Sequence, residues 1–206
     1  MAHICYIIGA GDIFPVKNKA DESDCIICAD GGYEYSSLLG RECDLVVGDF
    51  DSFGSIPETE NKIVAPCEKD DTDMTLAVKE GFKRGYREFV LFGALGGERF
   101  DHTVANIQLL GLICSMGGKG TIVHKNTVLT AFSDSEITFP EDSAGYVSVF
   151  SLCDESRGVT IKNMKYCVED FNLKSNNPVG VSNEFMGKES SISVEDGTLL
   201  VIYNKK

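Results

Sequence analysis

Short apolar runs and helical segments alternate through the first 125 residues of the chain. Apolar runs typical of buried strands occupy residues 3–8, 25–29, 45–47, 62–65 and 88–92. After the fourth run, apolar positions recur at helical spacing from residue 74 to residue 82, which predicts a helix. A shorter helix is expected over residues 33–39. Residues 103–116 are apolar on nearly every face, which predicts a buried helix. This alternation predicts a parallel α/β (Rossmann-like) sheet with right-handed crossovers.

The pattern changes after residue 125, where helical spacing disappears. Short strands separated by turn residues are predicted over 127–132, 136–139, 146–150, 158–162, 191–194 and 198–203. Such closely spaced strands are typical of a β-sandwich or a barrel-like domain. The sequence therefore predicts two domains, an α/β domain over residues 1–125 and an all-β domain over residues 126–206.

Acidic residues follow the predicted strands of the α/β domain. Asp30 comes directly after one strand, where it either meets a ligand or is only a turn residue before two glycines. Asp49 and Asp51 come just after the next strand, beyond Gly48. The carboxyl ends of parallel strands meet at one edge of a sheet, where open α/β sheets bind ligands. Hard cations such as Mg²⁺ take oxygen ligands, usually one or two carboxylates with water and substrate phosphates. We therefore expect a nucleotide bound through metal, with Phe50 packed away from the ligand.

Further acidic residues precede the two long predicted helices. Asp73 lies in an acidic cluster beside Thr72, and Asp101 lies in a loop with Arg99 and His102. Gly residues and a helix N-terminus in that loop suit an anion, and the planar Arg fork suits phosphate oxygens. Thr72 or Asp71 can cap the following helix, and helix capping alone accounts for one or two of the three acids in the cluster. Asp101 is a metal ligand or a helix cap in this interpretation, and His102 polarises a substrate or only satisfies its loop.

Two further segments carry weaker signals. Gly9 and Gly11 follow the first strand, where backbone N–H groups can approach phosphate, but the third glycine of a dinucleotide-binding turn is replaced by Phe14. In the β half, residues 180–185 place two small polar groups before Phe185. This segment is either a turn with a core phenylalanine or a rim that binds a flat ring.

Composition excludes several classes of protein. Thirty-two acidic against 19 basic residues give a formal net charge of −13, which argues against general nucleic-acid binding. The first residues lack the basic region and cleavage site of a signal peptide, and no apolar run is long enough for a membrane span. We therefore expect a cytoplasmic protein with small-molecule substrates, without nucleic-acid or membrane partners.

Five motifs together resemble the thiamine pyrophosphokinase (thiamine diphosphokinase) family, and the resemblance covers nearly the whole chain. They span residues 29–32, 48–52, 69–73, 96–102 and 180–183. The resemblance implies an enzyme that transfers a pyrophosphoryl group from ATP to the hydroxyl of thiamine, giving AMP and thiamine diphosphate. It also implies Mg²⁺ dependence and a homodimer, with thiamine in a cleft between subunits. The α/β domain would then bind ATP and metal, and the β domain thiamine and the second subunit.

The resemblance also assigns roles to individual residues. The expected catalytic acids are Asp49, Asp51, Asp73 and Asp101, of which the first three would bind metal. The expected residues on the ATP side are Asp30, Gly31, Thr72, Arg99 and His102, and those on the thiamine side are Ser182, Asn183 and Phe185. Some relatives place a Trp beside the thiamine ring; this chain has none, and Phe185 is the expected stacking partner.

Two other functions remain compatible with the motifs. A Mg²⁺-dependent phosphohydrolase acting on a nucleotide or a phosphorylated metabolite also uses two Asp residues, one residue apart, at a strand end. A non-catalytic module that binds nucleotide or metal would show no turnover, although the acidic loops lack EF-hand spacing.

Overall fold

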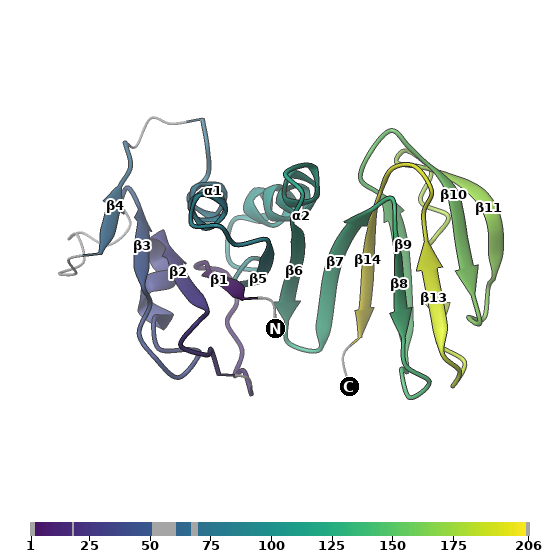
Figure 1. Cartoon of the computed structure of the whole chain (residues 1–206), viewed down its shortest axis with the longest axis horizontal. Helices are drawn as coiled ribbons and strands as arrows, with labels where there is room; N and C mark the ends of the chain where they lie inside the picture. The colour runs from purple at the N-terminus through teal and green to yellow at the C-terminus, as the bar shows by residue number, and fades with distance from the viewer. Residues whose placement is uncertain (1–2, 18, 51–60, 67–69, 205–206) are drawn as a thin grey trace. The chain divides into compact units, whose positions relative to one another are not determined.

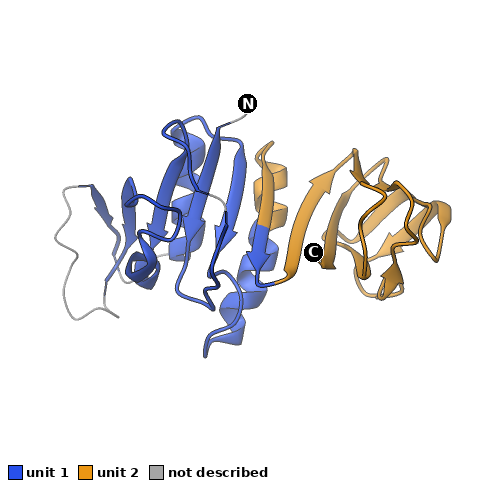
Figure 2. Cartoon of the chain, turned by 90° about the horizontal axis from the view of Figure 1, so that it is seen from below, with its two compact units in different colours: residues 1–109, 122–125 blue, residues 110–121, 126–206 orange. Residues whose placement is uncertain are grey.

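The computed structural model describes residues 3–17, 19–50, 61–66 and 70–204 (Figure 1). The chain divides into two compact units, coloured separately in Figure 2. Unit 1 comprises Met1–Leu109 and Ile122–Lys125, and unit 2 comprises Leu110–Thr121 and Asn126–Lys206. The sequence analysis expects a single domain boundary after residue 125. The structure differs in that residues 110–121, which precede this boundary, belong to unit 2.

Unit 1 contains the strands formed by the first apolar runs and the helices between them. They are β1 (Ile4–Ile8), β2 (Cys25–Ala29), the 3₁₀ helix η1 (Asp30–Tyr35), β3 (Leu45–Gly48), β4 (Lys62–Val64), α1 (Asp73–Lys83) and β5 (Glu88–Phe92). The next two elements, α2 (Phe100–Ser115) and β6 (Lys119–His124), each contain a boundary between the units. The elements of unit 2 are β7 (Thr127–Ser133), β8 (Glu136–Phe139), β9 (Tyr146–Ser151), β10 (Glu155–Lys162), β11 (Val168–Lys174), β12 (Asn183–Glu184), β13 (Ser190–Ser193) and β14 (Thr198–Asn204).

The described strands form one large mixed sheet and one antiparallel sheet. The ten-stranded sheet has the order β12-β9-β14-β7-β6-β5-β1-β2-β3-β4, and the four-stranded sheet has the order β11-β10-β13-β8. Within unit 1, β1 pairs in parallel with both β2 and β5, and the parallel pairing continues through β3 to β4. The mixed α/β class expected from the sequence is confirmed.

The central strands of unit 1 are apolar because they are buried in its core. All five residues of β2 are buried, as expected for a central strand that is covered on both faces. Helix α1 contacts β1, β2 and β3, and its buried face consists of Met74, Ala77, Val78 and Gly81. These positions repeat with the helical period, so one stripe of α1 is buried against the sheet.

The core of unit 2 is shared by its two sheets. One cluster of buried side chains includes Val147 and Val201 from the large sheet and Val159 and Ile192 from the small one. Alternate residues of each strand contribute to this cluster, which is the pattern of two sheets packed face to face.

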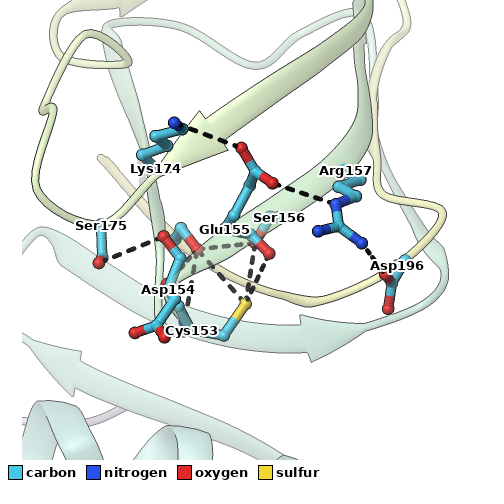
Figure 3. A network of polar contacts seen from close by, with 9 residues as sticks. Cys153, Asp154, Glu155, Ser156, Arg157, Lys174, Ser175 and Asp196 are labelled. Atoms are coloured by element: carbon cyan, nitrogen blue, oxygen red, sulfur yellow. Dashed lines mark hydrogen bonds and ion pairs between the residues drawn. The ribbon is translucent and has the colours of Figure 1, made fainter.

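A network of polar contacts lies at the end of β9 and the start of β10 in unit 2 (Figure 3). The hydroxyls of Ser151 and Ser156 lie 2.8 Å apart, and Ser156 Oγ donates to the Thr198 carbonyl at 3.1 Å. The Thr198 N–H donates to Cys153 Sγ at 3.5 Å. Burial raises the pKa of the Cys153 thiol, but the bonds from Ser151, Ser156 and the Thr198 N–H outweigh burial and hold this pKa below its ordinary value. The network gives the buried hydroxyls of Ser151 and Ser156 hydrogen-bond partners that they would otherwise lack.

Four of the described elements differ from the sequence-based expectation. The segment expected as a helix over 33–39 is instead a 3₁₀ helix that begins at Asp30. The strands β6, β11 and β12 were not expected. No helix within the described ranges is long and apolar enough to cross a membrane.

Candidate active site

Two acidic residues lie at adjacent strand ends of unit 1. Asp30 follows β2 directly, and Asp49 follows β3 directly. The two strands are parallel neighbours, with Ala29 opposite Val47, so both acids lie at the carboxyl edge of the sheet. A Cβ atom at Gly48 would lie 3.0 Å from the Asp30 Cα atom, which explains why a residue without a side chain precedes Asp49. The structure thus places Asp30 and Asp49 at neighbouring strand ends, and the expectation that Asp51, Asp73 and Asp101 join them in one site stays a prediction.

The residues that follow β2 and β3 have an unusual backbone conformation. Asp30 has a φ of 43° and Phe50 a φ of 59°, so both residues adopt the left-handed conformation that non-glycine residues rarely take. Phe50 is buried in the apolar cluster with Ile8, Ile26 and Val46. The prediction that Phe50 packs in the core is confirmed. Residue Asp51, expected to act with Asp49, lies outside the described residues.

The glycine-rich loop after β5 is fastened to the loop after β1. The N–H groups of Gly9 and Gly11 donate to the carbonyls of Phe92 and Gly93, at 2.9 and 2.8 Å. A Cβ atom at Gly93 would lie 2.2 Å from the Gly9 carbonyl oxygen, so the backbones touch at this point. The expectation that the Gly9–Gly11 turn could offer N–H groups to phosphate is therefore wrong for Gly9 and Gly11, because the turn uses these donors internally.

Asp12 also contacts the loop between β5 and α2. Its carboxylate accepts the Gly97 N–H at 3.1 Å, and its own N–H donates to the Leu95 carbonyl at 2.8 Å. Sequence reasoning assigned no role to Asp12, although an Asp directly after a Gly-x-Gly turn is a signal for such a loop contact. Asp12 thus positions the loop that leads to Arg99.

Arg99, Asp101 and His102 lie together at the start of α2. Arg99 Nη2 donates to the Asp101 carboxylate at 2.8 Å, and the His102 N–H donates to the Arg99 carbonyl at 3.1 Å. All three residues are exposed. The hydrogen bond from the Arg99 guanidinium holds the pKa of Asp101 below its ordinary value. Asp101 is therefore ionised at neutral pH, as a hydrogen-bond acceptor for a hydroxyl or a ligand for a cation must be.

The acidic cluster before α1 combines a helix cap with an ion pair. Thr72 is the N-cap of α1, and its hydroxyl accepts the Thr75 N–H at 3.2 Å. Asp71 pairs with Lys79 at 2.6 Å, and Asp73 occupies the first turn of the helix. The capping interpretation is thus confirmed for Thr72, whose expected contact with ATP stays a prediction. Gly31 lies in η1, directly after Asp30.

The donor chemistry of this edge fits a hard cation. Among the described residues, no three His, Cys, Asp or Glu side chains are grouped so that they could hold a metal ion. Mg²⁺ needs only one or two protein carboxylates, because water and substrate phosphates complete its coordination. Asp49, which follows β3 at this edge, provides a carboxylate of that kind, so a magnesium ion bound together with phosphates is compatible with the residues present.

The expected thiamine-side residues lie in unit 2, around β12. Ser182 is exposed and left-handed, with a φ of 61°, and its N–H donates to Ser148 Oγ at 3.1 Å. Asn183 is buried and bonds to the backbone of Tyr166. Phe185 is 9% exposed and packs in the core against Phe139, with ring centroids 5.1 Å apart. Of the two interpretations of this segment, the structure therefore favours a turn with a core phenylalanine for Phe185.

Comparison with known proteins assigns a family to both halves of the chain. "Thiamin pyrophosphokinase, catalytic domain" matches residues 16–115, and "Thiamin pyrophosphokinase, vitamin B1 binding domain" matches residues 134–199. Among curated proteins, no sequence matches the chain.

Solved structures with the same fold cover almost the whole chain. A thiamine pyrophosphokinase from Bacillus subtilis is 23% identical, with a TM-score of 0.84 over 98% of this chain and 99% of the other. A thiamin pyrophosphokinase from Geobacillus thermodenitrificans is 26% identical, with a TM-score of 0.81 over 98% of each chain. A thiamin pyrophosphokinase from Candida albicans is 17% identical, with a TM-score of 0.71 over 99% of this chain and 90% of the other, and shows a shared fold. With both of its halves matched, the chain belongs to the thiamine pyrophosphokinase family of enzymes.

Proposed function

We propose that the protein transfers a pyrophosphoryl group from ATP to the hydroxyl of thiamine, giving thiamine diphosphate and AMP. The observation that supports this proposal most directly is the meeting of Asp30 and Asp49 at adjacent parallel strand ends of unit 1. Open α/β sheets bind phosphorylated ligands at this edge. The matches to a catalytic and a vitamin B1 binding domain support thiamine as the second substrate.

In this proposal the residues of unit 1 bind and align ATP. Asp49, Asp51 and Asp73 would hold Mg²⁺, which supplies charge neutralisation on the phosphates. Asp30, Gly31, Thr72, Arg99 and His102 would contact the nucleotide, and the planar guanidinium of Arg99 suits phosphate oxygens.

The thiamine hydroxyl would attack the β-phosphorus in line with the departing AMP. A bond forms between the hydroxyl oxygen and the β-phosphorus, the bond from the β-phosphorus to the bridging oxygen of AMP breaks, and the hydroxyl proton is lost to solvent. The ion pair with Arg99 keeps Asp101 ionised but makes it a weak base. Asp101 would therefore orient the hydroxyl by accepting its hydrogen bond, and alignment would contribute most of the rate enhancement.

Product analysis tests the proposed reaction. The purified protein is incubated with ATP, Mg²⁺ and thiamine, and products are identified by mass spectrometry and phosphorus NMR. AMP and thiamine diphosphate in equal amounts are the expected products. Free phosphate as the product would indicate the phosphohydrolase instead, and unchanged ATP would indicate a binding module; ADP would also contradict the proposal.

Replacing one acid tests whether the strand-end carboxylates carry the reaction. We expect Asp49→Asn to lower kcat by about 100-fold or more, the scale seen when one electrostatic contact to the transition state is removed. Asp51→Ala should abolish turnover without unfolding the protein. Asp21→Asn is the matched control, because Asp21 is an exposed acid that precedes β2 rather than following it. Asp49→Asn activity close to wild type would contradict this assignment.

The remaining proposed properties concern assembly and substrate range. We propose a homodimer, on the basis of the family resemblance, with ATP and thiamine as small-molecule substrates. Analytical ultracentrifugation at several protein concentrations measures the oligomeric state, and a monomer at all concentrations would contradict the dimer.

A further inference from the structure

The glycine-rich loop between β5 and α2 is held by hydrogen bonds from two neighbouring segments. Gly93, Gly96 and Gly97 have positive φ values of 58°, 78° and 73°. Glycine adopts this conformation without strain but loses more conformational freedom on folding than any other residue. Each residue from 93 to 97 has a backbone group bonded to the loop after β1 or to α2. The conformation of the loop is therefore fixed by its neighbours.

Two of these bonds come from side chains on α2. Asn106 Nδ2 donates to the Ala94 carbonyl at 2.7 Å, and the Gly96 N–H donates to Thr103 Oγ1 at 3.2 Å. Thr103 and Asn106 are three positions apart, so both side chains lie on the same face of the helix. One face of α2 thus holds both a carbonyl and an N–H of the loop.

Asn106 is a buried amide within an apolar stripe of α2. It is 6% exposed, and Leu109, Leu110 and Ile113, which follow at helical spacing, are buried as well. An amide at such a position costs free energy unless it is hydrogen-bonded. The Ala94 carbonyl provides that bond, so the polar group of Asn106 serves the loop rather than the packing of the helix.

Asp12 holds the same turn from the segment after β1. Its carboxylate accepts the Gly97 N–H at 3.1 Å. A Cβ atom at Gly96 would collide with this carboxylate, so the acid rests directly against the turn. Thr103 and Asp12 therefore bind adjacent N–H groups of the loop, those of Gly96 and Gly97.

The exposed pair of Arg99 and Asp101 follows this turn in the chain. Arg99 Nη2 lies 2.8 Å from the Asp101 carboxylate, and the Arg99 carbonyl accepts the His102 N–H at the start of α2. An exposed pair on a flexible loop would have to be ordered each time a substrate binds, which costs conformational entropy. A loop that is already held avoids that cost.

We propose that Thr103 and Asn106 are positioning residues for the reaction, and that they act together with Asp12 through the loop. Their role is to hold Arg99 and Asp101 in the orientation that the phosphates and the thiamine hydroxyl require. This inference rests on the proposed function, since it names the side chains that support the proposed substrate contacts. The three positioning side chains do not touch the reacting atoms, and their contribution appears in kcat, because it concerns alignment.

Matched threonine variants test the inference. Thr103→Val keeps the shape of the side chain but removes the acceptor for the Gly96 N–H. It should lower kcat by about tenfold or more, toward the roughly 100-fold that a misplacement of about 1 Å can cost. Thr103→Ser keeps the hydroxyl and should keep kcat near the wild-type value. KM for thiamine and the thermal unfolding midpoint should change little in both variants.

The amide on α2 has its own matched control. Asn106→Ala should lower kcat by about tenfold or more, whereas Gln108→Ala should not, because Gln108 is an exposed amide on the same helix. Asp12→Ala combined with Thr103→Val should lower kcat by less than the product of the single effects, because both changes release the same turn. Should Asn106→Ala unfold the protein, the Thr103 variants still decide the inference.

Hydrogen–deuterium exchange supplies a readout that needs no turnover. In Thr103→Val, the amides of residues 94–99 should exchange faster than in the wild type, and those of α1 should not. Unchanged exchange in residues 94–99 would overturn the inference. So would an unchanged kcat in Thr103→Val, a Thr103→Ser variant as slow as Thr103→Val, an equal loss in Gln108→Ala, or fully independent effects of Asp12→Ala and Thr103→Val. A wild type that forms no thiamine diphosphate would instead contradict the proposed function, and the exchange measurement would still decide whether these side chains hold the loop.

Discussion

At the scale of single residues, burial separates the side chains that shape unit 2 from those that can meet a ligand. Phe185 contacts Phe139 in the core, and Phe139 in turn contacts Tyr203, with ring centroids 5.1 Å apart in each pair. The chain therefore uses the aromatic residue of its Ser-Asn-Glu-Phe segment to anchor that segment, not to present a ring.

Replacing Phe185 distinguishes anchoring from ligand binding. We expect Phe185→Ala to lower the free energy of unfolding by about 3–5 kcal/mol, because it opens a cavity in a packed core. Urea denaturation followed by circular dichroism measures the change. Phe171→Ala, at an exposed position, should change the same quantity by less than about 0.5 kcal/mol. Unchanged stability with weakened thiamine binding in Phe185→Ala would contradict anchoring and support stacking.

Sequence reasoning identified the residue types of the site but not all of their uses. The acids after β2 and β3 could be predicted, because strand ends and carboxylates are both visible in the sequence. The contact between Tyr166 and Asn183 could not, because its hydrogen bonds join residues 17 positions apart in an irregular region. No periodic pattern signals a contact of this kind.

At the scale of elements, α1 shows how local chemistry sets the start of a helix. Thr72 Oγ1 accepts the Thr75 N–H, one of the donors that the first helical turn leaves without a backbone partner. Asp73 in the first turn and Lys83 in the last turn complement the helix dipole. The start, the buried stripe and the end of α1 were therefore close to the sequence-based expectation.

Substitution of the cap tests whether Thr72 serves the helix or the nucleotide. We expect Thr72→Ala to lower the free energy of unfolding by about 1 kcal/mol, whereas Thr72→Ser keeps the hydroxyl and should lose only a few tenths. Denaturation curves of the two variants measure this difference. A contribution to ATP binding would appear separately, as a raised KM for ATP in Thr72→Ala that Thr72→Ser restores. Equal stability of the alanine variant and the wild type would contradict the capping role.

The elements that sequence reasoning missed lack a clean hydrophobic period. Five of the seven residues of β11 are exposed, and its pairing with β10 contains register shifts, so apolar and polar positions do not alternate. β6 contains Gly120, and a Cβ atom there would lie 2.8 Å from the side chain of Leu110. Glycine weakens the strand signal in the sequence, whereas the structure needs it for close packing.

At the scale of the whole molecule, the chain passes between its two units more than once. Residues 110–121 belong to unit 2, residues 122–125 return to unit 1, and the remainder belongs to unit 2. Thr130 Oγ1 donates to the Gly120 carbonyl at 3.1 Å, which ties the earlier segment of unit 2 to the later one. The sequence indicated a change from helical to strand patterns near residue 125. It did not indicate that residues 110–121 belong to unit 2, because the apolar pattern of α2 continues across the unit boundary.

Fragments of the chain test this division. We expect residues 110–206 to retain more β-structure and a more cooperative thermal transition than residues 126–206, which lack a segment of their own unit. Circular dichroism measured across a thermal ramp compares the two fragments. Equal melting behaviour would show that unit 2 folds without residues 110–121.

The contact between the loops after β1 and β5 has a consequence for motion. Gly9, Gly11 and Asp12 bond to Phe92, Gly93 and Leu95, and the Asp12 carboxylate holds Gly97. Neither loop can detach without breaking bonds of the other, so amide hydrogens in both should exchange with solvent through one shared opening event. The segment that leads to Arg99 would then be held rigid by the loop that follows β1.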